Sequence, residues 1–169
     1  MADAWTVYRT HPTADEIADV LGQRLTATFG TPNADGSIHL AAVIFLHRDD
    51  HLYLETSSVT RKARNARRAG TASMLIQGIA TTGRNVMVSA EGTARVIEGP
   101  EAHDINETLR AKYLRTETLD AINRVWGRLD DVAIELSPQT WRSWTSAVFH
   151  EVTEAELGAP FEEAWRSTD

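Results

Sequence analysis

Short apolar runs, each bounded by turn-forming residues, set the pattern of the chain from residue 25 onward. Their length and their content of Val, Ile, Leu and Thr are typical of β-strands. Asp35-Gly36 and Asp49-Asp50 supply turn chemistry, so the first strands are expected to pair antiparallel. The expected strands cover 25–31, 38–46, 52–56, 72–77, 132–136 and 139–146, with two more within 85–97.

Helical periodicity is confined to a few segments. Thr13 and Glu16 have the spacing of a capping box, and apolar residues follow at helical intervals, which predicts a helix over about 13–22. Further helices are expected at 60–69, 101–114, 117–129 and, in part, within 153–166. Short, closely spaced strands with few helices favour a barrel over a doubly wound sheet. We therefore expect a single mainly β domain with peripheral helices (α+β) over 1–169, with an acidic C-terminal tail over about 150–169.

Composition narrows the function classes. The 169 residues are 42% hydrophobic and 24% charged, as in ordinary globular domains. The absence of cysteine excludes disulfides, zinc fingers, iron–sulfur clusters and thiol catalysis. The net charge of -7 argues against a general nucleic-acid binder. No apolar run is long enough to span a membrane and the N-terminus lacks the features of a signal peptide, so a cytoplasmic protein without membrane contact is expected.

The predicted helix over 60–69 carries an electrostatic anomaly. Arg61 and Lys62 fall in its first turn, where the helix dipole disfavours cations. A bound anion would resolve the conflict, since the first amides, the capping hydroxyls and both cations would point toward it. We interpret Arg61 and Lys62 as a phosphate site. For Arg64, Arg67 and Arg68 a solvated basic face explains the sequence equally well.

The order of elements around this helix resembles a known family. Turn Asp35-Gly36, a buried strand ending in Val43-Ile44-Phe45, a strand ending in Glu55-Thr56-Ser57 and the run Thr60-Arg61-Lys62 are followed by the strand ending in Gln77. This series resembles the pyridoxamine phosphate oxidase-like split β-barrel family, which includes the flavin/deazaflavin-dependent oxidoreductases. The resemblance covers roughly residues 25–144.

The resemblance implies an antiparallel split barrel of the FMN-binding type, a homodimer, and FMN or the deazaflavin coenzyme F-420 bound at the dimer interface. It also implies a set of cofactor-binding residues. The cofactor phosphate would be held by Thr60, Arg61 and Lys62, with Glu55, Thr56 and Ser57 beside the phosphate or ribityl chain. The ring would lie above Val43, Ile44 and Phe45, which would touch it mostly through backbone, and Gln77 would contact the ring or tail. The partner's cofactor would be reached by Arg142 and Trp144.

The chain departs from the oxidases of that family. The second strand and the residues just after it read Leu40-Ala41-Ala42 and Leu46-His47, where those enzymes have basic residues. That exact activity is therefore doubtful. The resemblance favours hydride transfer between bound cofactor and a small organic substrate, with no side chain assigned as a catalytic acid or base. Tyr113 and Arg115 could meet the cofactor tail or a substrate, although a helix end with a core tyrosine explains them better.

Two further choices stay open on the sequence alone. One is a non-catalytic protein that sequesters a cofactor or binds haem, for which His103 and His150 are the available axial ligands. The other is the identity of the cofactor. A helix N-terminus with two cations matches the single phosphate of FMN, whereas the polyglutamate tail of coenzyme F-420 needs a further basic groove. We favour FMN narrowly. The scattered histidines, His47 and His51 included, give no metal pattern.

Overall fold

The computed structural model describes residues 10–126 and 130–164. Seven strands form one antiparallel sheet in the order β2-β1-β5-β6-β7-β4-β3. The strands are β1 (Thr26–Pro32), β2 (Ile38–Ile44), β3 (Leu46–Arg48), β4 (His51–Ser57), β5 (Thr71–Ile79), β6 (Asn85–Ile97) and β7 (Asp131–Trp144). The helices are α1 (Ala14–Gly22), α2 (Arg61–Ala69), α3 (Gly99–Tyr113), α4 (Thr116–Trp126), α5 (Ala147–Leu157) and the short 3-10 helix η2 (Phe161–Ala164).

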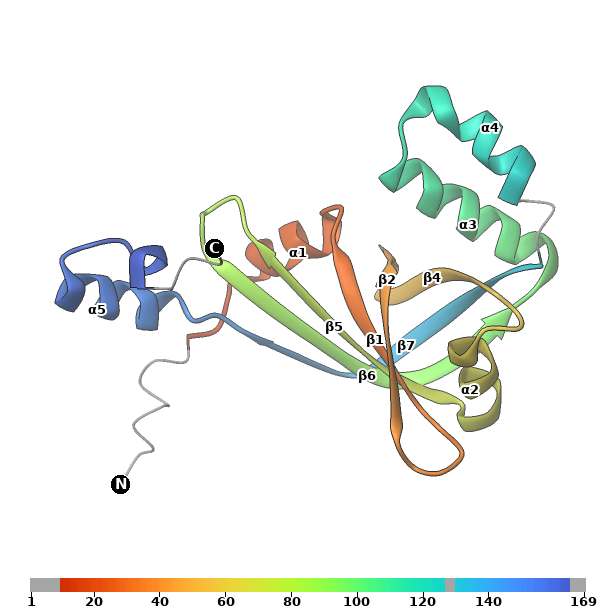
Figure 1. Cartoon of the computed structure of the whole chain (residues 1–169), viewed down its shortest axis with the longest axis horizontal. Helices are drawn as coiled ribbons and strands as arrows, with labels where there is room; N and C mark the ends of the chain where they lie inside the picture. The colour runs from red at the N-terminus through yellow and green to blue at the C-terminus, as the bar shows by residue number, and fades with distance from the viewer. Residues whose placement is uncertain (1–9, 127–129, 165–169) are drawn as a thin grey trace.

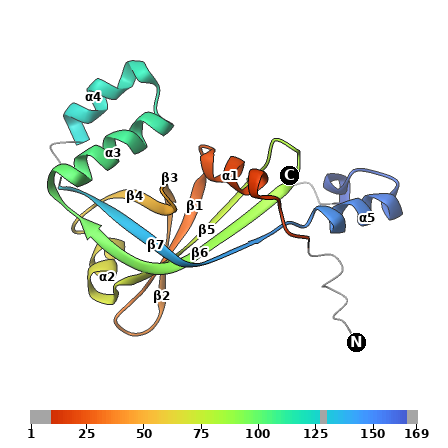
Figure 2. The same ribbon diagram turned by 180° about the vertical axis from the view of Figure 1, so that it is seen from behind.

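The sheet curls into a half-barrel, as Figure 1 shows, so the predicted α+β split barrel is confirmed. Its inner face holds the main core, which includes Phe29, Leu54, Ile76 and Ile134. Seen from behind in Figure 2, the α3–α4 hairpin and α5 extend from opposite ends of the sheet. No helix within the described residues is long and apolar enough to cross a membrane.

The starts predicted for α1 and α2 are confirmed by their caps. Thr13 caps α1 and forms the expected capping box with Glu16, whose carboxylate accepts from the Thr13 amide at 2.9 Å. Thr60 caps α2, which ends at Gly70 in the left-handed conformation (φ 65°). The tail becomes helical earlier than expected, because α5 begins at Ala147. The last residues predicted for 117–129 and 153–166 lie outside the described residues.

Three strand predictions were wrong. The run 38–46 is two strands, β2 and β3, because the ladder with β1 ends at Ile44 and β3 pairs with β4 instead. The two strands expected within 85–97 are the single strand β6, and the two expected over 132–136 and 139–146 are the single strand β7. The register between β6 and β7 shifts at Glu91/Gly92, so the ladder bends there without ending.

Gly92 permits that bend. It lies against the backbone of Ser137, Pro138 and Gln139 on β7, and a Cβ atom at this position would overlap the Ser137 carbonyl oxygen. Only glycine therefore allows β6 and β7 to pass so closely.

Candidate functional site

The N-terminus of α2 meets the end of β4 through a small network of hydroxyl groups. Thr60 Oγ1 donates to the Ser57 carbonyl at 2.9 Å and accepts from the Ala63 amide at 3.4 Å. The buried Thr56 hydroxyl lies 3.0 Å from Thr60 Oγ1. The structure thus brings four of the predicted phosphate residues, Thr56, Ser57, Thr60 and the adjoining Arg61, to one corner of the sheet.

Three of the five basic side chains of α2 are held by their own chain. Arg64 donates to the Val59 carbonyl at 2.7 Å, and Arg68 donates to the Pro32 carbonyl. Arg67 donates to the Ser58 carbonyl at 2.9 Å and forms an ion pair with Glu98. These contacts hold α2 against its surroundings, and they leave Arg61 and Lys62 of the first turn as the basic side chains of this helix that form no hydrogen bond within the described residues.

Arg61 and Lys62 form no hydrogen bond or ion pair within residues 10–126 and 130–164, although Arg61 acts electrostatically on Asp35. The Lys62 side chain is half-buried, and desolvation alone lowers its pKa from the ordinary value. A cation that is partly removed from water without a counter-charge, at a helix N-terminus, is destabilised on both counts. A bound anion would compensate both effects, so the residues present fit a phosphate group.

Asn65 orients α2, and sequence reasoning missed it. Its buried side chain donates to Thr31 Oγ1 at 3.2 Å and to Asn33 Oδ1 at 2.9 Å, which ties the helix to β1 and to the turn before β2. The signal was available, since Asn65 is a polar residue between Ala63 and Ala66 on the buried face of the helix.

The backbone from Val43 to Phe45 is held rigidly from α3. The Val43 and Phe45 side chains are buried in the core, so only their backbone is available to a ligand, whereas Ile44 is half-buried. Phe45 lies between β2 and β3, where the Tyr113 hydroxyl accepts from its amide at 3.3 Å and lies 2.8 Å from the Leu25 carbonyl. Tyr113 therefore has the structural role that the sequence favoured, and it fixes this stretch of backbone.

Lys112 contacts the same stretch of backbone. Its ammonium lies 3.3 Å from the Leu21 carbonyl and 3.4 Å from the Phe45 carbonyl, above the Phe45 ring at 4.5 Å. Burial lowers the pKa of Lys112. Sequence reasoning missed this residue, because nothing in a helical lysine indicates that it returns to the end of a distant strand.

Glu55 is engaged by a buried cation. Arg110, fully buried on α3, forms ion pairs with Glu55 and Asp131 and donates to Asn123 Oδ1 at 3.2 Å. Burial raises the pKa of Glu55 despite the guanidinium beside it. Its expected position beside the phosphate stays a prediction, and the contact that the structure shows is with α3.

The remaining predicted residues lie on the outer face of the sheet. The strand register places Gln77, Met87 and Trp144 in one cross-strand row and Leu75, Ser89 and Arg142 in the next. Arg142 and Trp144 share a face, as expected for alternate residues of a strand. The Arg142 guanidinium pairs with Glu91 at 2.7 Å. No hydrogen bond or ion pair of the described chain joins this group to the Thr60–Lys62 corner.

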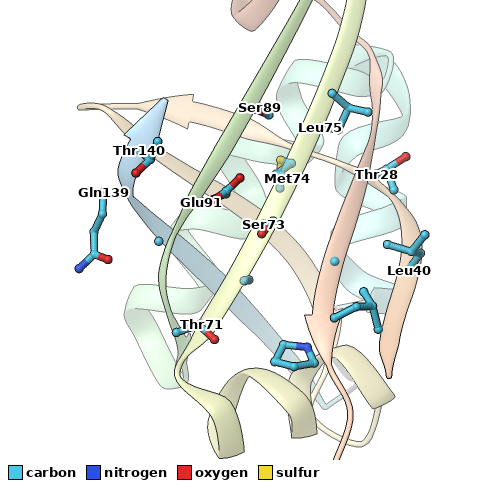
Figure 3. Close-up of a pocket in the computed structure, with 15 residues that line it drawn as sticks. Thr28, Leu40, Thr71, Ser73, Met74, Leu75, Ser89, Glu91, Gln139 and Thr140 are labelled. Atoms are coloured by element: carbon cyan, nitrogen blue, oxygen red, sulfur yellow. The ribbon is translucent and has the colours of Figure 1, made fainter. Parts of the chain in front are cut away.

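Beside this group the outer face is hollowed. A depression of about 720 Å³ extends across β2, β1, β5, β6 and β7. Figure 3 shows its lining side chains spread over the sheet, with Leu40 and Thr28 on one side and Thr140 on the other. Exposed apolar side chains gather on the same face: Ile38 and Leu40 are 60% and 62% exposed, and Leu75 and Ile79 38% and 59%.

Neither candidate haem ligand is free. His150 Nε2 lies 3.1 Å from Ser146 Oγ, and its ring stacks on Phe161 at 4.3 Å. His103 is exposed and lies 3.3 Å from Glu107. No cluster of His, Asp and Glu that could hold a metal occurs in the described part of the chain.

The fold defines a split-barrel protein, and the candidate phosphate corner lies beside the end of a strand. The profile of the pyridoxamine 5'-phosphate oxidase family matches residues 13–145, and the chain belongs to this family. No curated protein matches it.

Solved structures share the fold. The conserved hypothetical protein Rv2991 from Mycobacterium tuberculosis is 26% identical, with a TM-score of 0.67 over 94% of this chain and 92% of that one. An F-420 reductase is 18% identical, with a TM-score of 0.55 over 78% and 98% of the two chains. The haem storage protein HutZ from Vibrio cholerae is 16% identical, with a TM-score of 0.61 over 78% and 94%.

Proposed function

We propose that the protein is a flavin-dependent oxidoreductase that transfers hydride between bound FMN and a small organic substrate. The observation that carries the proposal is Lys62, a half-buried cation in the first turn of α2 for which the described residues supply no counter-charge. A terminal phosphate is a compact dianion that supplies the missing charge. Membership of the oxidase family supports a flavin at this position.

The contacts of α2 favour FMN over the deazaflavin coenzyme F-420. The polyglutamate tail of the deazaflavin needs basic groups in addition to those that bind the phosphate. Arg64, Arg67 and Arg68 could supply them in part, but each guanidinium already uses a donor on a carbonyl of its own chain, and Arg67 also pairs with Glu98. Arg61 and Lys62 keep all their donors free within the described residues, and together they match one phosphate. The fold-level similarity to an F-420 reductase keeps the deazaflavin as the second candidate.

The chain would position the cofactor rather than supply a catalytic acid or base. When bound, the flavin ring accepts or donates the hydride. Thr60, Arg61 and Lys62 would bind the phosphate, and the backbone at Ile44 and Phe45, held by Tyr113, would support the ring. Positioning of this kind lowers the barrier by removing the freedom of the reactants before the reaction.

A homodimer would complete the site. Gln77, Arg142 and Trp144 lie on the outer face, apart from the phosphate corner, and a second chain would bring its own set to that corner. The exposed apolar side chains of β2 and β5 on this face are those that association of two copies would bury. Two-fold symmetry would give two equivalent cofactor sites.

The visible absorbance spectrum of the purified protein tests the proposal. Bound FMN gives a flavin spectrum, whereas haem would give an intense Soret band and the deazaflavin a single band at shorter wavelength than FMN. Cofactor-free protein is then titrated with FMN. A protein that carries haem and does not bind FMN would contradict the proposal and favour the haem-binding alternative.

A further inference from the structure

A second cavity, of about 330 Å³, lies beneath α1. One wall is the apolar side of this helix, formed by Ile17, Ala18 and Leu21. The opposite wall includes His47 of β3 and Trp141 of β7, whose rings meet edge to face with centroids 6.0 Å apart. Figure 1 shows α1 crossing the end of β5 and β6 at this place. The volume is at the lower end of cavities that hold small organic ligands, about 300–1,000 Å³.

This cavity lies apart from the proposed phosphate corner and shares Arg142 with the set of residues proposed to reach the partner's cofactor. None of its lining residues belongs to the Thr60–Lys62 corner or to the depression on the outer face. Arg142 lines it, but its guanidinium is paired with Glu91. An occupant of the cavity can therefore be tested without assuming that FMN is bound.

Two lining side chains, His47 and Asp50, have no hydrogen bond or ion pair within the described residues. Asp50 forms no hydrogen bond or ion pair within the described residues, although it lies in a two-residue turn in which both Asp49 and Asp50 have positive φ, 52° and 60°. Positive φ at both positions is the usual geometry of a two-residue hairpin turn, which aspartate tolerates, and this turn places the exposed Asp50 among the residues that line the cavity. The His47 imidazole also lacks a hydrogen-bond partner in this part of the chain.

The charges around the cavity determine whether a cationic or an anionic ligand is favoured. Burial has the largest effect on His47 and lowers the pKa of its imidazole; Lys112 acts in the same direction, whereas Asp50 and Asp49 oppose it, and the net pKa is lowered. With Arg142 paired, Asp50 is the one lining charge without a partner in the described chain. The positive charge of Lys112 lies on the His47 side of the cavity, which places the favourable position for a cation at Asp50 instead.

We propose that the cavity binds a small organic cation, with a flat apolar body between α1 and Trp141 and an ammonium group at Asp50. The apolar walls favour the body through burial of its surface, and the ring of Trp141 adds a flat surface suited to an aromatic ligand. The carboxylate supplies a charge-assisted hydrogen bond, which discriminates an amine from an acid of the same size.

Calorimetric titration with phenethylamine and 3-phenylpropionate tests the proposal on the purified full-length protein. The two probes share a phenyl ring and differ in charge. Saturable binding of the amine, at least about fivefold tighter than that of the acid, is expected. Equal affinity for the two probes, or no saturable binding of the amine, would overturn the proposal.

Two variants locate the site. Asp50→Asn keeps the size of the side chain and should weaken amine binding by about fivefold or more, whereas Asp49→Asn, in the same turn but outside the cavity, should change it less than about twofold. Ala18→Phe should block both probes by filling the cavity. If Asp49→Asn causes the same loss as Asp50→Asn, or Ala18→Phe leaves binding intact, the probe binds elsewhere. Circular dichroism spectra confirm that each variant is folded.

Discussion

Replacement of Lys62 by methionine separates a phosphate site from a solvated basic helix. Lys62→Met keeps the length and most of the apolar stem while removing the charge. The side chain is half-buried and has no counter-charge in the described chain, so its ammonium is available to a ligand. A hydrogen bond to a charged group contributes about 1.5–3 kcal/mol, which corresponds to a loss of roughly ten- to a hundredfold in FMN affinity.

The cofactor-free protein should respond in the opposite direction. Removing a cation from the first turn of α2 relieves its repulsion with the helix dipole, which is worth about 0.3–1 kcal/mol for an exposed group. Urea unfolding of the cofactor-free variant should therefore show equal or slightly higher stability than the parent protein. Loss of affinity together with retained stability identifies Lys62 as a ligand-binding group rather than a structural one.

The pH dependence of stability and of FMN affinity gives a second test of the role of Lys62. Because burial lowers the pKa of Lys62 below the ordinary 10.5, the unfolded chain holds this proton more tightly than the folded chain. The free energy of unfolding of cofactor-free protein should thus gain more with rising pH, in the alkaline range below 10.5, than that of Lys62→Met. A bound phosphate favours the charged lysine, so FMN affinity should fall as the pH rises through the lowered pKa.

Fluorescence titration with FMN measures the affinities, because flavin emission changes on binding. Arg124→Met is the matched control: Arg124 is an exposed cation on α4, and its replacement changes the net charge by the same amount far from α2. Unchanged FMN affinity in Lys62→Met would refute the assignment. An equal loss in both variants would show that net charge, not a local contact, controls binding.

Three further outcomes are expected. Leu40→Asp, on the outer sheet face, should shift the protein in sedimentation from a dimer toward the 18.7 kDa monomer, whereas Val125→Asp on α4 should not. Arg110→Met should lower the free energy of unfolding in urea by about 3–5 kcal/mol, because two carboxylates lose their buried partner. Tyr113→Phe should cost about 1–3 kcal/mol in the same assay, since the Phe45 amide loses its acceptor, and should weaken FMN binding if this backbone supports the ring.

Local chemistry made much of the fold predictable. The capping box at Thr13 and Glu16, the N-cap at Thr60 and the stop at Gly70 each depend on neighbours in sequence, and each is present. The errors in the strand predictions arose where strand boundaries depend on pairing between strands that are distant in the sequence. The sequence predicted two strands within 85–97, but in the sheet Gly92 lets the single strand β6 bend past β7 without ending.

The candidate site likewise has parts that could be predicted from the sequence and parts that could not. Arg61 and Lys62 were identifiable because the dipole conflict is local to one helix turn. The ion pair between Glu55 and Arg110 could not be identified from the sequence, because the two residues are 55 positions apart and meet only when α3 packs on β4. The cavity at Asp50 likewise depends on α1, β3 and β7 coming together, so the sequence offered only an unusual Asp-Asp turn.

The central claim is that the α2 corner binds the phosphate of FMN, and equilibrium titration of the cofactor-free protein with FMN and with coenzyme F-420, each at low and high salt, tests it most directly. We expect FMN to bind more tightly than the deazaflavin, with a modest dependence on salt, because Arg61 and Lys62 are the two cations of α2 that form neither a hydrogen bond nor an ion pair within the described residues. Tight deazaflavin binding that falls steeply with salt, alongside weak FMN binding, would contradict the account.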